Sequence, residues 1–323
     1  MTEEQMMEKQ MMEKQTMEKQ TMEKQMMEKQ TVEKKFNILD NFVIYVVVLY
    51  FMIIAGQLLG DFLMSLIRDG FVNLNPELRY DGSVTTFFSY AQTVGAWIVT
   101  LLILIIFKKN RYILSSLGIK TKGNNIKMLL VGLFLGFAMN GFCALTAYLN
   151  GDIDLTYSGF SPLPVILIFL AVFVQSSSEE IICRGYLYQK LLKKYNKPAV
   201  AIWGNALLFA ALHFLNPGFT IWSMINITAV GVLFSLLVYY FDSIWCAFAV
   251  HAAWNFTQNI ILGLPNSGNV MPYSIFKLEA GNARDSFFYN VGFGIEGTII
   301  ADIVIILMCV VIYLIGKKKK EQK

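Results

Sequence analysis

The sequence predicts an all-α, multi-pass membrane protein with about eight transmembrane helices. Hydrophobic amino acids make up 55% of the 323 residues, and the mean hydropathy is +0.51. Apolar runs recur along the chain, and each is long enough to cross about 30 Å of hydrocarbon as a helix. Lysine and arginine gather in alternate loops between these runs, as the positive-inside rule requires. A soluble core explains one such run but not a series.

The expected transmembrane spans form one membrane-embedded domain over residues 38–316, between a polar tail at 1–37 and a basic tail at 317–323. We place the spans at residues 38–66, 86–107, 126–148, 162–190, 198–215, 219–241, 243–263 and 292–316. The first run is too long, and too far from residue 1, for a cleavable signal peptide.

The loop charges predict the orientation in the cell membrane. The bases lie in the second loop, in the fourth loop and in the C-terminal tail: Lys108, Lys109, Arg111, Lys120, Lys122, Lys127, Arg184, Lys190, Lys193, Lys194, Lys197 and Lys317 to Lys320. The segments 149–161 and 216–219 carry no base, and 264–291 balances two bases against two acids. An even number of spans with cytoplasmic N and C termini fits this pattern.

The tail at 1–37 repeats the pentapeptide MMEKQ or TMEKQ from Met6 to Gln30. Five residues advance a helix by about 140° beyond a full turn, so no coiled-coil seam forms. We expect a polar cytoplasmic tail that is partly helical or disordered.

Charge and cysteine content exclude other classes of protein. The net charge of +4 reflects the basic inner loops and is no sign of nucleic-acid binding. The four cysteines are scattered over four spans without the paired spacing of a disulfide or metal framework, and they are expected to be small core residues.

Ionisable side chains inside the spans are the candidate functional residues, because each costs several kcal/mol at roughly mid-bilayer depth. In the fourth span, Glu180 and Arg184 are four residues apart in the order that favours an ion pair. Neighbouring side chains on a helix point about 100° apart, so Glu179 faces another direction and is the better candidate for chemistry.

The fifth span carries Phe209 and His213 one helical turn apart. If the fourth and fifth spans form a hairpin that turns near Asn196, Glu179 and His213 each lie seventeen residues from the turn. Both side chains are then about 25 Å from the turn, at the same level.

The seventh span carries His251 and Asn255, again one turn apart, after an inner turn at Asp242. We therefore expect a carboxylate, two imidazoles and a carboxamide to converge in the cytoplasmic half of the bilayer. A carboxylate with a neighbouring imidazole can take a proton from water, and imidazole and amide N–H groups can stabilise an oxyanion. This set of groups suits amide hydrolysis with water as the nucleophile. Taken singly, each pattern is also typical of structural residues.

The ordered set of patterns resembles the three motifs of the CPBP (Abi) family, which comprises type II CAAX prenyl endopeptidases and bacteriocin-processing or immunity proteins. The motifs are EExxxR at Glu179-Glu180-Ile181-Ile182-Cys183-Arg184, FxxxH at Phe209-Ala210-Ala211-Leu212-His213, and HxxxN at His251-Ala252-Ala253-Trp254-Asn255. The resemblance covers roughly residues 126–263 and implies a helical intramembrane protease.

The resemblance also implies residue roles. Glu179 and His213 would activate water, His251 and Asn255 would hold the oxyanion, and Glu180 and Arg184 would orient the site. Glu179, His213 and His251 could instead be three zinc ligands with an open position. The sequence has no HExxH motif, and we favour the metal-free glutamate mechanism without a cofactor.

Three functional classes follow. The leading one is an endopeptidase that cuts a membrane-associated or lipidated substrate, such as a CAAX-like tail or a leader peptide, near the cytoplasmic face. The second is a non-proteolytic scaffold or bacteriocin-immunity protein of the same family. The third is a transporter that uses Glu179, Asp61 and Asp302 as an ion path, which the missing inverted repeat disfavours.

Overall fold

A computed structural model describes residues 7, 11–12, 15–23, 41–119 and 121–322. The chain divides into two compact units, residues 1–45 and 46–323. In the first unit, residues 15–23 of the pentapeptide repeat form a helix. Most of the repeat lies outside the described residues, and the expectation of a partly helical or disordered tail there stays a prediction.

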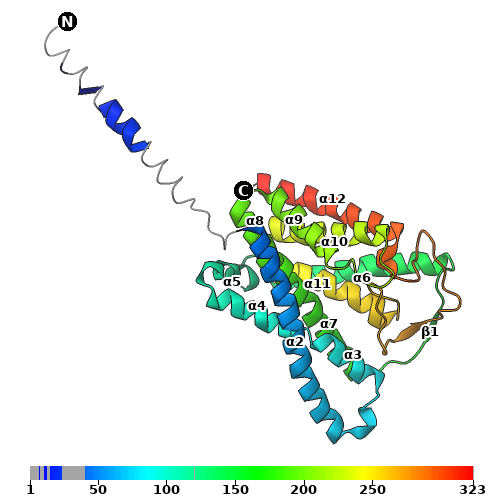
Figure 1. Cartoon of the computed structure of the whole chain (residues 1–323). Coiled ribbons are helices and arrows are strands. Elements are labelled where there is room, and N and C mark those ends of the chain that lie inside the picture. The colour runs from blue at the N-terminus through cyan, green and yellow to red at the C-terminus, as the bar shows by residue number, and fades with distance from the viewer. Residues whose placement is uncertain (1–6, 8–10, 13–14, 24–40, 120, 323) are drawn as a thin grey trace. The chain divides into compact units, whose positions relative to one another are not determined.

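The second unit is a bundle of helices with one small two-stranded sheet (Figure 1), and its first helix, α2, begins in the last residues of the first unit. The helices are α2 (Phe42–Leu74), α3 (Gly82–Ala91), α4 (Val94–Ile106), α5 (Tyr112–Leu117), α6 (Ile126–Leu149), α7 (Pro162–Glu180), α8 (Tyr188–Tyr195), α9 (Pro198–Ala211), α10 (Ile221–Phe241), α11 (Ile244–Asn255) and α12 (Ile299–Glu321). The π-helix η4 (Ile181–Leu187) joins α7 to α8, and a second π-helix, η5 (Phe256–Ile261), extends α11. Short 3₁₀ turns occur at η2 (Pro76–Leu78), η3 (Lys108–Asn110) and η6 (Ile295–Gly297).

The described part of the chain has six helical stretches long and apolar enough to cross a membrane. They are Phe42–Leu74, Gly82–Ile106, Ile126–Leu149, Pro162–Tyr195, Ile221–Phe241 and Ile299–Glu321. The predicted multi-pass helical bundle is thus confirmed, but the count of eight is not. The fifth expected span is the 14-residue α9, which stops before Pro217 and Gly218, and the seventh is the 12-residue α11 followed by the π-helix.

Two predicted turns lie where the sequence placed them. Asn196 and Asp242 both adopt the left-handed conformation, with φ of 50° and 52°, at the C-terminal ends of α8 and α10. Asparagine and aspartate tolerate this conformation better than most residues, so each can end its helix and reverse the chain.

The basic segments meet at one end of the bundle, which we call the lysine-rich end: residues 108–119, 121–127, 188–197, 239–246 and 317–321. The Lys190 ammonium donates to Asn110 at 3.2 Å, and the Asn124 side chain caps α11 by accepting from the Ile244 amide at 3.0 Å. The Lys320 ammonium lies 3.2 Å from the centre of the Tyr239 ring.

The opposite end, called here the polar-loop end, consists of residues 150–161, 212–220 and 262–298. Strand β1 (Leu155–Tyr157) pairs antiparallel with β2 (Phe276–Leu278) and joins the first of these segments to the third. The buried Asp152 carboxylate accepts from the Arg284 guanidinium at 3.1 Å and from the Ser286 hydroxyl. The long connection before α12 is therefore folded onto the bundle.

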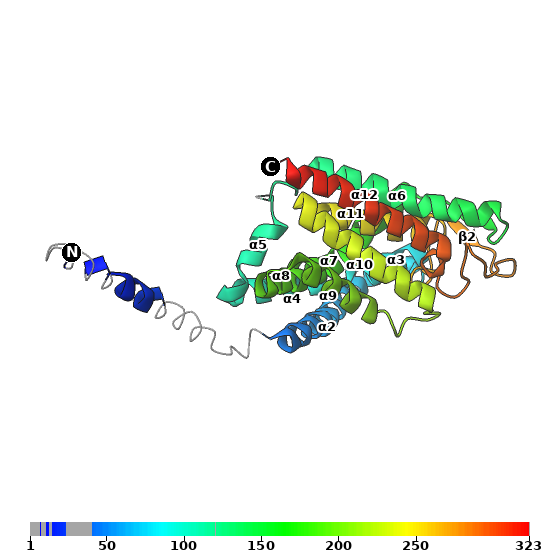
Figure 2. The same ribbon diagram turned by 90° about the horizontal axis from the view of Figure 1, so that it is seen from above.

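Close packing of small residues fixes α11 against α6, which lie side by side in Figure 2. A Cβ added at Gly132 or Gly136 of α6 would come within 2.5 Å or 2.4 Å of a backbone oxygen of α11. Glycine allows this approach because it has no side chain. The GxxxG pattern thus serves packing within the chain and positions the helix that carries His251.

Candidate active site

Residues from all three sequence motifs line one cavity of about 230 Å³. Glu179 reaches it from the end of α7, His213 from the turn after α9, and His251 and Asn255 from α11. Four side chains separated by up to 76 positions in the sequence therefore surround a common space, as the sequence analysis expected.

Glu180 and Arg184 form the expected ion pair, at 2.9 Å between Arg184 Nη1 and Glu180 Oε1. Both side chains are fully buried. The same oxygen of Glu180 accepts from His251 Nδ1 at 3.0 Å. Glu180 thus links the first motif to the third. It also orients the His251 ring so that the other ring nitrogen, Nε2, points away from Glu180.

Glu179 faces the cavity and not the ion pair. Its side chain is 35% exposed, whereas that of Glu180 is fully buried. The Gln175 amide, one turn earlier on α7, donates to Glu179 Oε1, and His251 Nε2 lies 3.9 Å from Glu179 Oε2. That separation exceeds a direct hydrogen bond and is one that a bridging water can span.

The hydrogen bond of His213 indicates its tautomer. His213 Nδ1 lies 2.8 Å from the Phe209 carbonyl oxygen. Because a carbonyl oxygen can only accept, Nδ1 carries the hydrogen, and Nε2 of the neutral ring has a free lone pair. His213 can therefore accept a proton through Nε2.

The Phe209 ring lies in contact with groups from all three motifs. The guanidinium carbon of Arg184 is 4.3 Å from its centre, and the His213 and His251 rings are centred at 4.9 Å and 6.3 Å. The Phe234 ring, from α10, covers Arg184 at 5.2 Å. Aromatic faces stabilise a buried cation, so the two rings support the charge of Arg184.

The Asn255 amide connects α11 to α7 by hydrogen bonds. Its Nδ2 donates to Gln175 Oε1 at 3.2 Å and to Ser176 Oγ at 3.3 Å. Gln175 consequently contacts both Glu179 and Asn255, and it was not among the residues that the sequence singled out. Its position one turn before Glu179 was the available signal.

Comparison with known families adds a finding to this geometry. Residues 161–257 match the family described as type II CAAX prenyl endopeptidase Rce1-like. The matched segment includes every residue of the three motifs. The chain carries an Rce1-like domain. This confirms the family that the motifs predicted. No curated protein and no solved structure matches the chain.

A buried carboxylate beyond the matched Rce1-like segment supports the site. Glu296, in η6, accepts from Trp254 Nε1 at 3.1 Å and from Asn266 Nδ2 at 3.2 Å through one oxygen. Its other oxygen accepts from the amide and the hydroxyl of Ser267, both at 2.7 Å. Asn266 also donates to Asn255 Oδ1 at 3.2 Å. The sequence analysis missed Glu296, which lies near the start of the expected span at residues 292–316.

The two π-helices were also unexpected. One begins at Ile181, directly after the two glutamates, and the other at Phe256, directly after Asn255. A π-helix is wider than an α-helix, so it rotates the residues that follow and is often found at functional sites. Periodicity of apolar residues carries no signal for it.

The zinc alternative requires three metal-ligating side chains to be grouped around one position. Across the described residues, no three His, Cys, Asp or Glu side chains are grouped so that they could hold a metal ion. Glu179, His213 and His251 line the same cavity without forming such a group. The four cysteines are free. Neither Asp61 nor Asp302, the other members of the transporter alternative, lines the cavity.

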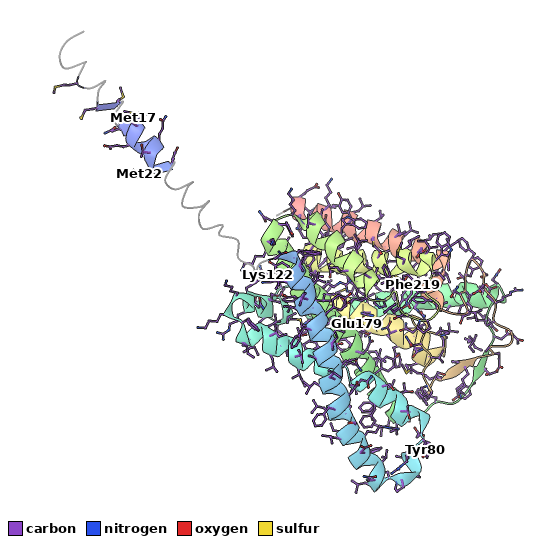
Figure 3. All side chains as sticks on the ribbon, in the orientation of Figure 1. Met17, Met22, Tyr80, Lys122, Glu179 and Phe219 are labelled. Atoms are coloured by element: carbon purple, nitrogen blue, oxygen red, sulfur yellow. The ribbon has the colours of Figure 1, made fainter. Side chains whose placement is uncertain are left out.

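The cavity extends toward the polar-loop end. Its wall includes Asn216, Asn266, Ser267 and Asn269 from the polar loops, and no residue of the lysine-rich end. Figure 3 labels Lys122 at the lysine-rich end and Phe219 in a polar loop, with Glu179 between them. The sequence did not show that residues 262–298 fold back onto the motifs. The expected placement of the four side chains in the cytoplasmic half of the bilayer stays a prediction.

Proposed function

We propose that this protein is an intramembrane endopeptidase in which Glu179 and His213 activate a water molecule. The observation that supports this most strongly is the convergence of Glu179, His213, His251 and Asn255 on one cavity within an Rce1-like domain. Because the matched family is that of type II CAAX prenyl endopeptidases, we take the substrate to be a membrane-associated or lipidated peptide, such as a CAAX-type tail or a leader peptide.

Proton transfer begins at the partly exposed Glu179 carboxylate. Together with the free lone pair of His213 Nε2, it takes a proton from water that attacks the substrate carbonyl carbon. The proton then passes to the leaving amine as the C–N bond breaks. A positioned acid–base group of this kind contributes about 10²–10⁴-fold to the rate.

Charge on the substrate oxygen is stabilised from α11. His251 Nε2 faces the cavity because Nδ1 is engaged by Glu180, and an imidazolium at this position donates from both nitrogens. The Asn255 amide donates once a substrate oxygen replaces one of its two present acceptors, Gln175 or Ser176. Losing one oxyanion donor costs about 10²–10³-fold in rate.

No metal has a step in this proposal. Glu180 and Arg184 position His251, and Phe209 positions His213 through its carbonyl oxygen.

The membrane orientation belongs to the same proposal: the lysine-rich end, with the C-terminal tail, is cytoplasmic, because positively charged loops are retained on that side. The N-terminal tail is cytoplasmic by the same rule.

The test is cleavage of a panel of fluorogenic, membrane-tethered peptides by detergent-purified protein. The panel includes a CAAX tail and a leader peptide, and it is applied to wild type, Glu179→Gln and His213→Ala. Asp61→Asn is the matched control, since it changes a membrane carboxylate that hydrogen-bonds Gln57 outside the cavity.

We expect wild type and Asp61→Asn to cleave and the two cavity variants to lose activity. Cleavage that survives in Glu179→Gln would rule out the proposed base. A wild type that cleaves no member of the panel would favour the scaffold or immunity function instead.

A further inference from the structure

The cavity has a polar mouth at one end and an apolar floor at the other. Asn269, which lines it, is solvent-exposed and belongs to the polar loops. Phe234 and Val250, which also line it, are buried at 2% exposure. Below them, toward the lysine-rich end, Arg184 is completely buried. The cavity therefore reaches the surface at the polar-loop end.

Helix geometry gives the range of depths that the cavity spans, independently of its exposure. Asn226 and Ile305 line it from α10 and α12 and lie five and six residues from the helix ends that face the polar loops. At about 1.5 Å per residue, these positions are about 8–9 Å from that end, whereas Phe234 on α10 is thirteen residues, or about 20 Å, from it. No residue lining the cavity comes from the segments that make up the lysine-rich end.

Charge separates the two ends just as clearly. The lysine-rich end carries Lys317 to Lys320 and the bases around α8, whereas the polar-loop segments balance Lys277 and Arg284 against acids such as Asp152 and Glu279. Positively charged loops remain in the cytoplasm. The polar-loop end, where the cavity opens, is therefore the outer end.

We infer that the site takes its substrate from the extracytoplasmic side of the membrane. The substrate class is a peptide segment exposed on, or anchored at, the outer leaflet, such as an exported peptide whose leader still crosses the bilayer. This inference rests on the proposed function for its chemistry, but the side on which the cavity opens does not depend on activity. A tail that remains in the cytoplasm reaches the lysine-rich end, where this cavity has no opening.

The side of the opening is tested in intact cells with a membrane-impermeant maleimide and with variants that each add one cysteine to the wild-type chain. Asn269→Cys reports the cavity mouth, Ala280→Cys an exposed polar-loop position, and Lys318→Cys the lysine-rich end. Wild type sets the background, because its own four cysteines are buried or half-buried. We expect the first two variants to be labelled in intact cells and Lys318→Cys only after permeabilisation. Labelling of Asn269→Cys only after permeabilisation would overturn the inference.

The substrate side is tested with one cleavable segment fused to an anchoring helix in two orientations. We expect cleavage when the segment lies outside the cell and loss of cleavage, to the level of Glu179→Gln, when it lies inside. The reverse preference would overturn the inference and leave the protease intact. Loss of cleavage in both orientations, together with inactivity of the purified protein, would reject the proposed function, and the maleimide result would still decide the side.

Discussion

Two adjacent glutamates have opposite environments, and this difference carries the proposed chemistry. Glu180 is buried between Arg184 and His251, whereas Glu179 is 35% exposed in the cavity. An acid or base must reach the reacting atoms, and a buried charge must be paired. The first requirement fits Glu179 and the second fits Glu180.

Changing each glutamate to glutamine is therefore expected to affect cleavage rate and thermal stability differently. Glu179→Gln should lose about 10²–10⁴-fold in cleavage rate with little change in thermal stability, because it removes a base and no buried partner. Glu180→Gln should lower both the cleavage rate and the thermal stability. Leaving the buried Arg184 charge uncompensated costs about 3–5 kcal/mol of folding stability. Cleavage rates and the thermal midpoint in one detergent would measure this. Equal stability loss in the two variants would contradict the distinction.

Glu296 is expected to position Asn255 through Asn266 and Trp254. All four groups that contact its oxygens are donors, so a glutamine there must point its own N–H at one of them. Leaving a buried donor unsatisfied costs about 1–3 kcal/mol, and Glu296→Gln should lower the thermal midpoint accordingly. Activity should fall with it and return in part at lower temperature. The exposed Glu279→Gln serves as the control, and an unchanged midpoint in Glu296→Gln would argue against the positioning role.

At the scale of elements, the contact between α6 and α11 determines where His251 and Asn255 lie. Gly136→Val should displace α11 or unfold the pair, because its Cβ would lie 2.4 Å from the Val250 carbonyl oxygen. Overpacking of this kind costs about 1–3 kcal/mol or more. Gly141→Val on the same helix is the control, since no atom lies within 4 Å of its added Cβ. Similar thermal midpoints for the two variants would contradict the packing.

The polar loops are held by Asp152, and this attachment should weaken in acid. Burial raises the pKa of the Asp152 carboxyl, but hydrogen bonds from Ser286, Asn150 and Arg284 more than offset it, so the pKa lies below its usual value of 3.8. A lowered folded-state pKa stabilises the protein above the unfolded-state pKa, and that stability is lost as the pH falls through the folded-state pKa.

We therefore expect wild type to lose stability below about pH 4, in the range where an ordinary aspartate titrates. In Asp152→Asn, the contribution of this group should be missing at neutral pH already, and the acid-dependent loss should be smaller. Thermal midpoints measured from pH 7 to pH 3 check this. Parallel pH profiles for the two proteins would show that Asp152 does not hold the loops.

The sequence predicted features correctly where the interacting residues lie close together along the chain. The turns at Asn196 and Asp242, the Glu180–Arg184 pair and the contact of Phe209 with His213 each follow from positions within one helix or at its end. The π-helices did not, because apolar periodicity does not report a local widening of the helix. The end of α9 was placed too late for a related reason, since an apolar run continues past the residue where the helix stops.

At the scale of the whole molecule, the sequence predicted a membrane bundle and a convergent site but not the position of the cavity. The alternation of basic and neutral loops separated the two ends correctly. Gln175, Asn266 and Glu296 became visible as part of the site only when the chain was folded, because the last two come from a connection that follows the motifs by more than ten positions. The depth of the site therefore required the tertiary structure.

The most direct test of the central claim is the initial rate of peptide cleavage by purified protein after exhaustive chelation, measured for wild type and Glu179→Gln. Metal-free activation of water by Glu179 predicts that the chelated wild type keeps its rate and that Glu179→Gln loses it. Loss of wild-type activity on chelation, with recovery on adding zinc, would contradict the account and assign the cavity to a metal.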